Sequence, residues 1–119
     1  MDEKRKVKRR FLLYYMRVYD GSTRHQIGNL VDITPKGVMI VSEEPLAENQ
    51  IMNIRIELTT DVSEKPYMEF SARSIWCETD VSPSLYNIGF EIIKILPEDK
   101  KIVQRINEVF GFRENKLTK

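Results

Sequence analysis

Hydrophobic and polar residues alternate along most of the chain with a period of two, which is typical of β-strands that bury one face. The clearest run has its apolar positions at Met52, Ile54, Ile56 and Leu58. Comparable runs, one of them short and continuously apolar, predict five further strands at residues 12–19, 26–33, 38–41, 68–76 and 86–92. In the fifth strand of the chain, one face is expected to carry Met68, Phe70, Ala72 and Trp76. Because no helical pattern separates the strands, we expect an antiparallel all-β fold, either a barrel or a sandwich.

The spacing of apolar residues becomes helical near the C-terminal end. The residues concerned are Ile102, Val103, Ile106, Val109 and Phe110. Pro97 suits a first helical turn and Gly111 suits a stop, so we predict one amphipathic helix near residues 97–110. We expect this helix to pack on the strands, with presentation of its apolar stripe to a partner as the alternative.

A turn with the sequence Thr34-Pro35-Lys36-Gly37 separates the strands predicted at 26–33 and 38–41. Pro35 cannot donate a hydrogen bond to a strand ladder. Gly37 permits a backbone angle that other residues resist. Both features favour a tight connection between two antiparallel strands.

The chain has 119 residues, of which 41% are hydrophobic, and a single globular domain is expected at residues 11–119. No apolar run is long enough to span a bilayer, and the N-terminus lacks the apolar core of a signal peptide. We therefore expect no membrane insertion and a cytoplasmic location. The sequence contains no glycine-rich phosphate loop and no His or Cys set with metal-ligand spacing. A catalytic pair of the lone Cys77 and the lone His25 is disfavoured, so we predict a binding protein with no cofactor rather than an enzyme.

Positive charge is concentrated in residues 4–10, which carry six positive charges in seven positions although the net charge is only +1. Such a segment repels itself and buries nothing, so residues 1–10 are expected to form a flexible basic arm. The near-zero net charge disfavours nucleic acid as a partner. A small RNA-binding barrel that uses the arm together with Tyr14, Tyr15 and Trp76 is kept as an alternative.

Two motifs in this order resemble the PilZ family, whose members receive the bacterial messenger cyclic di-GMP. The family pattern is Arg-x-x-x-Arg near the start of the domain, followed later by Asp/Asn-x-Ser-x-x-Gly. The matching residues are Arg5 and Arg9, then Asp32, Thr34 and Gly37, with Thr34 in place of the usual serine. The run at residues 87–91 is also similar to the last core strand of the family. The resemblance covers nearly the whole chain and implies a six-stranded antiparallel PilZ-like β-barrel with one C-terminal α-helix.

The resemblance implies that cyclic di-GMP is bound by Arg5, Arg9, Asp32, Thr34 and Gly37, with Arg10 as a weaker candidate beside the motif. The chemistry of these residues suits that ligand. A guanidinium can fork onto guanine O6 and N7 or clamp a phosphate with two hydrogen bonds. A carboxylate can accept from guanine N–H groups, a hydroxyl can add a hydrogen bond, and a glycine lets the backbone pass close to the ligand.

A second register of the arginine motif starts at Arg9 and places Leu13 at the position of the second arginine. Leu13 can bind neither phosphate nor guanine, and we prefer Arg5 and Arg9 because that register keeps residues 16–19 aligned with the first strand of the family. The expected function is a receptor that changes its contacts with an unidentified effector protein when it binds the nucleotide. The alternative is a PilZ-like scaffold that binds no nucleotide and acts only through protein contacts.

Overall fold

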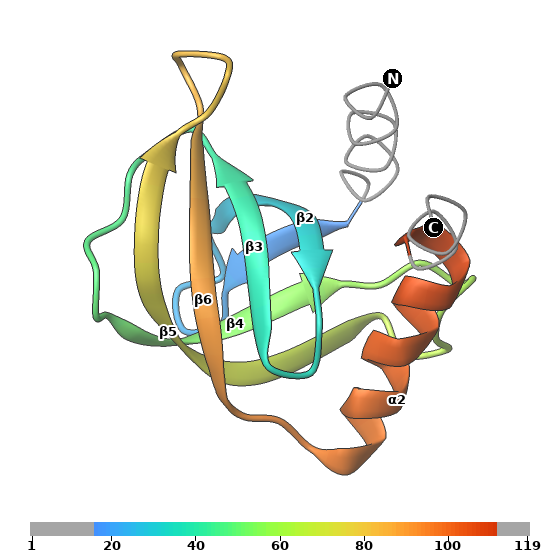
Figure 1. Ribbon diagram of the computed structural model, residues 1–119. Coiled ribbons are helices and arrows are strands. Elements are labelled where there is room, and N and C mark those ends of the chain that lie inside the picture. Colours follow the sequence, from blue (N-terminus) through green and yellow to red (C-terminus); the bar gives the residue numbers. More distant parts are fainter. Residues whose placement is uncertain (1–15, 112–119) are drawn as a thin grey trace.

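Six antiparallel strands close into a barrel in the computed structural model, which describes residues 16–111 (Figure 1). The strands are β1 (Arg17–Asp20), β2 (Gln26–Ile33), β3 (Gly37–Ser42), β4 (Ile51–Glu57), β5 (Tyr67–Thr79) and β6 (Tyr86–Lys94). Around the barrel they follow the order β1-β2-β3-β6-β5-β4, and β4 closes the ring by pairing with β1. The predicted barrel and its strand count are confirmed. The part of the first predicted strand at residues 12–15 lies outside the described residues.

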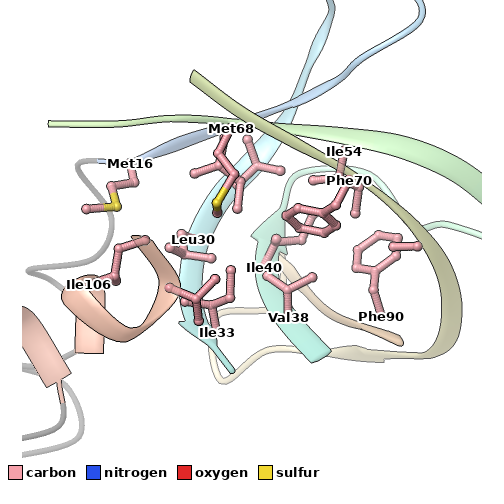
Figure 2. Close-up of a cluster of buried hydrophobic side chains, with 14 of the residues drawn as sticks. Met16, Leu30, Ile33, Val38, Ile40, Ile54, Met68, Phe70, Phe90 and Ile106 are labelled. Atoms are coloured by element: carbon pink, nitrogen blue, oxygen red, sulfur yellow. The ribbon is translucent and has the colours of Figure 1, made fainter. Parts of the chain in front are cut away.

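The inside of the barrel is filled by the apolar residues of the alternating pattern. Leu30, Ile40, Ile54 and Ile56 are fully buried, and Phe70 and Phe90 extend the same cluster from β5 and β6 (Figure 2). Burial of a large aliphatic or aromatic side chain contributes about 1.5–3 kcal/mol relative to leaving it exposed. The alternation in the sequence therefore determines which residues point inward wherever the pairing of a strand keeps its register.

The prediction that Trp76 shares a face with Met68, Phe70 and Ala72 is wrong. The pairing of β5 with β6 shifts between Ser74 and Trp76, which marks a β-bulge. A bulge adds one residue to a strand and reverses the facing of every residue after it. Ser74 is buried, while Trp76 pairs with Gly89 on the outer face of the barrel.

Helix α2 (Pro97–Ile106) covers one end of the barrel and continues for a turn of π-helix, η1 (Asn107–Gly111) (Figure 1). Pro97 stands in the first turn, as predicted. Val103 and Ile106 are buried, and Figure 2 shows Ile106 next to Met16, the first described residue. The helix packs its apolar stripe on the barrel rather than leaving it open. Within residues 16–111, neither helical segment has the length and apolar character to cross a membrane.

A buried carboxylate fixes the beginning of α2. Asp99 is only 2% exposed and accepts a hydrogen bond of 2.8 Å from the Lys65 ammonium, which comes from the loop between β4 and β5. This hydrogen bond and the negative charge of Asp99 raise the pKa of Lys65 above its usual value of 10.5. Lys65 is therefore charged at neutral pH, and the pair ties the helix to the barrel.

We predict that Lys65→Met lowers the free energy of unfolding because it leaves the Asp99 carboxylate buried without its ammonium. The loss should be about 1–2 kcal/mol, less than for a fully buried pair because Lys65 is half exposed. A raised lysine pKa stabilises the fold below pH 10.5 and loses this effect as the pH rises through the folded-state pKa. Urea unfolding should therefore show a constant deficit between pH 7 and 9 that shrinks above pH 10.5. Lys100→Met, an exposed lysine of α2, is the matched control, and an equal deficit in both variants would contradict the assignment.

Candidate functional site

The turn between β2 and β3 is held by backbone and side-chain hydrogen bonds. Thr34 and Gly37 exchange two backbone hydrogen bonds, Thr34 N to Gly37 O at 2.8 Å and Gly37 N to Thr34 O at 3.3 Å. The Thr34 Oγ1 atom accepts from the N–H groups of Lys36 and Gly37, both at 3.2 Å. Because the hydroxyl oxygen accepts these bonds, its hydrogen can be donated outward. Thr34, Pro35 and Lys36 are exposed, so the turn presents this hydroxyl at the surface.

Asp32 precedes the turn, near the end of β2, and is half-buried. Its Oδ1 atom accepts a hydrogen bond of 2.9 Å from the N–H of Ile33. Ile33 itself points into the core and is 1% exposed. The pairing of β2 with β3 shifts between Leu30 and Asp32, so Ile33 rather than Asp32 shares the inner face with Leu30 and the carboxylate lies on the outside. The local hydrogen bond limits how the carboxylate can rotate.

Gly37 does not use the backbone angle that the sequence suggested, because no glycine of the described residues has a positive φ. Its role is close packing between strands. A Cβ atom at Gly37 would lie 2.9 Å from the carbonyl oxygen of Phe90 in β6. The glycine therefore allows β3 and β6 to approach one another where the turn begins.

A row of outward-facing residues crosses three strand pairs next to the turn. Asp32 pairs with Met39 of β3, Met39 pairs with Gly89 of β6, and Gly89 pairs with Trp76 of β5. The indole of Trp76 lies directly on Gly89, and a Cβ atom at Gly89 would overlap its ring. The row brings a carboxylate and a flat aromatic surface to the same side of the barrel.

These residues line a shallow hollow of about 210 Å³. Its walls include Asp32, Thr34, Gly37, Met39, Ile75, Trp76 and Gly89. A drug-sized ligand occupies a pocket of about 300–1,000 Å³, so this hollow can hold one ring system but not a whole dinucleotide. The rest of a larger ligand would have to be contacted by residues that do not belong to the barrel strands.

A second cavity, of about 810 Å³, lies at the far ends of β2 and β3, next to His25 and Glu43. It is larger than the hollow, but none of the motif residues that the structure describes, Asp32, Thr34 and Gly37, lines it. We therefore place the candidate site at the smaller hollow, where Asp32, Thr34 and Gly37 lie together.

Arg5, Arg9 and Arg10 lie outside the described residues, and so does Leu13 of the alternative register. The point where the chain enters the barrel is described. Met16 accepts a hydrogen bond of 2.9 Å at its carbonyl from Leu30 N, and Thr34 lies four residues further along, about 13 Å away. An extended chain spans at most about 3.6 Å per residue, so Arg9 and Arg5 both have enough chain to reach the turn.

The sequence pattern did not identify Trp76 as part of this site. A period-two pattern assigns it to the inner face, because a bulge leaves no signature in hydrophobicity. The available signal was Gly89, a glycine inside an otherwise continuous strand, which often marks a close approach by another group. In the structure that group is the indole of Trp76.

Comparison with known proteins gives a consistent result. The family model of the PilZ domain matches residues 3–108. Among solved structures, the B. subtilis inhibitor of motility (MotI/DgrA) is similar at a TM-score of 0.62 and 15% identity, over 85% of this chain and 47% of that one. The apo structure of MrkH of K. pneumonia is similar at 0.60 and 17%, over 87% and 48%. The chain thus spans about half the length of these proteins, and the likeness to them concerns the fold. No curated protein matches the sequence.

We predict that Gly89→Ala moves the indole of Trp76, because the added methyl group cannot share its space with the ring. Overpacking of this kind costs about 1–3 kcal/mol. Trp76 is the only tryptophan, so its emission should shift to longer wavelength as it becomes more exposed to water. Gly21→Ala is the control. A Cβ atom at Gly21 would lie 3.1 Å from side-chain atoms of Asn53 and Glu69 and not against the indole, so the variant should leave the emission unchanged. An unchanged Gly89→Ala spectrum would contradict the close packing.

Proposed function

The chain belongs to the PilZ domain family, which consists of receptor and adaptor domains for cyclic di-GMP rather than enzymes, and on that premise we propose that it binds cyclic di-GMP. The observation that carries the proposal is the convergence of the Asp32–Gly37 turn with Trp76 at one hollow of the outer barrel surface. Residues 32 and 76 are far apart in the sequence, and an ordinary turn would not need an aromatic surface beside it.

The hollow supplies groups that fit one guanine. The Asp32 carboxylate can accept from the N–H groups of the guanine edge, whereas adenine presents an acceptor at the corresponding ring position. The Thr34 hydroxyl can donate to a ligand oxygen. The Trp76 indole offers a flat surface on which a base can stack, an interaction worth about 1–3 kcal/mol per base.

The remainder of the ligand, with two phosphates and a second guanine, extends beyond the hollow. We propose that Arg5 and Arg9 bind this part from outside, with Arg10 in a lesser role. Their guanidinium groups can clamp phosphate with paired hydrogen bonds or fork onto guanine O6 and N7. An anionic ligand also offsets the mutual repulsion among the six positive charges at residues 4–10.

The proposed consequence of binding is a change in contacts with an effector protein. The bound nucleotide, together with the arginines proposed to bind it, would form a surface that the free protein lacks. A scaffold without nucleotide, the alternative function, predicts no binding at the hollow and can be separated by titration.

We predict that cyclic di-GMP binds with measurable heat in calorimetry and changes the emission of Trp76, while GTP does neither at the same concentration. Asp32→Ala should weaken binding by about ten- to a hundredfold, because hydrogen bonds to a charged group are worth about 1.5–3 kcal/mol. It should also reduce discrimination against the adenine counterpart, since the carboxylate reads the guanine edge. Asp61→Ala, a carboxylate on the loop between β4 and β5, is the control. Failure of the unchanged protein to bind would leave the scaffold function in its place.

We predict that Arg9→Ala abolishes detectable binding and that Arg5→Ala weakens it less. Arg9 is closer to the barrel along the chain, so less of its freedom is lost when it contacts the ligand. Leu13→Ala should leave affinity unchanged once folding is controlled for by circular dichroism, because the Leu13 side chain has no group that binds phosphate or guanine. Tight binding that survives the loss of both Arg5 and Arg9 would refute the assignment of the arginines.

A further inference from the structure

Asn107 joins the C-terminal helix to the candidate site. It stands where α2 ends and η1 begins, and its Nδ2 atom donates a hydrogen bond of 2.8 Å to the carbonyl oxygen of Ile33. The same Nδ2 also donates to the carbonyl oxygen of Val103 at 3.2 Å. One side-chain amide therefore connects the last turn of the helix to the residue between Asp32 and Thr34.

The Ile33 peptide groups need partners outside the β2–β3 hairpin. Thr34 and Gly37 exchange hydrogen bonds, so the adjacent pair of Ile33 and Val38 is a non-hydrogen-bonded pair whose N–H and C=O groups point away from one another. On the other side, the pairing of β1 with β2 that the structure describes ends at Asn29, and only the bond between Met16 and Leu30 lies beyond it. The end of β2 thus overhangs the described part of β1.

At this overhang, two side chains form hydrogen bonds with the backbone N–H and C=O groups of Ile33. The Asp32 carboxylate accepts from the Ile33 N–H at 2.9 Å, and the Asn107 amide donates to the Ile33 carbonyl at 2.8 Å. Because both side chains bond to the same residue, the position of the Ile33 backbone couples the Asn107 amide to the Asp32 carboxylate. Any rotation of the Ile33 backbone would move the acceptor of Asn107 and the donor that holds Asp32.

We propose that Asn107 is a positioning residue for the nucleotide site, acting through Ile33 on the Asp32 carboxylate and on the turn that carries Thr34. This inference rests on the proposed function. Asn107 touches no ligand in this scheme. It keeps the rigid half of the site in its binding geometry and makes that geometry depend on the seating of α2.

The test compares Asn107→Leu, which keeps the size of the side chain but removes the donor, with Gln104→Leu. Gln104 is an exposed amide on α2, so the same chemical change is made where the barrel is not contacted. Loss of one neutral hydrogen bond predicts a roughly three- to tenfold weaker affinity for cyclic di-GMP in Asn107→Leu and an unchanged affinity in Gln104→Leu. The preference for cyclic di-GMP over its adenine counterpart should also fall, because Asp32 is the group that moves. General destabilisation would leave that preference intact.

A second measurement needs no ligand. Amide hydrogen exchange of Ile33 and Gly37, followed by NMR in the free protein, should be faster in Asn107→Leu than in Gln104→Leu, while amides of β4 stay equally protected. Equal exchange in the two variants, or an unchanged affinity and preference, would overturn the positioning role. If the unchanged protein binds no cyclic di-GMP, the proposed function fails, and the exchange rates alone decide whether Asn107 positions the turn.

Discussion

The bulge in β5 is the constraint on which the candidate site depends. It is held from the inside by Ser74, whose hydroxyl donates to the carbonyl of Ala47 at 2.7 Å and accepts from Gln50 N at 3.0 Å. The backbone of Ser74 also bonds to the residues before β4, from its N–H to Gln50 O and from Asn49 N to its carbonyl. With Ser74 fixed, the extra residue of the bulge turns Trp76 outward onto Gly89. Without the bulge, the indole would compete for space with the buried core.

The position of β3 between β2 and β6 explains why distant residues meet at one hollow. β3 pairs with β2 through the turn and with β6 through a register that sets Met39 opposite Gly89. Gly37 and Gly89 both remove side-chain volume along this seam, one facing the Phe90 carbonyl and the other the Trp76 ring. The absence of a side chain at these two glycines therefore accounts both for the close approach of the strands and for the shallow outer surface. The barrel supplies a rigid platform, and the chemistry lies on its outer face.

The sequence predicted the strands, the helix and the turn because each depends on a local pattern. Residues 52–58 alternate cleanly, and Ile54 and Ile56 are indeed buried. The facing of Trp76 could not be predicted, since the bulge is fixed by hydrogen bonds from Ser74 to a loop more than twenty residues away. The reason for Gly37 was also missed, because its neighbour is a carbonyl of β6 and not a feature of its own turn. The tie from Asn107 to Ile33 spans 74 residues and leaves no mark in either segment.

The negative charge of Asp32 implies that attraction for the phosphates and preference for the base come from different residues in the proposed function. Cyclic di-GMP carries two phosphates, and a carboxylate near them is repelled, so the hydrogen bonds proposed between Asp32 and a guanine would form against an opposing field. The barrel surface at the hollow can therefore choose the base but contributes little net attraction to the anion. Attraction has to come from cations, and the six positive charges at residues 4–10 are the largest group in the sequence. Their effect acts over about 8–10 Å and is screened by salt, whereas the hydrogen bonds at Asp32 act only at contact. In the proposed function, affinity and base preference therefore come from different parts of the chain, the arginines at residues 5 and 9 for the first and the Asp32 carboxylate for the second.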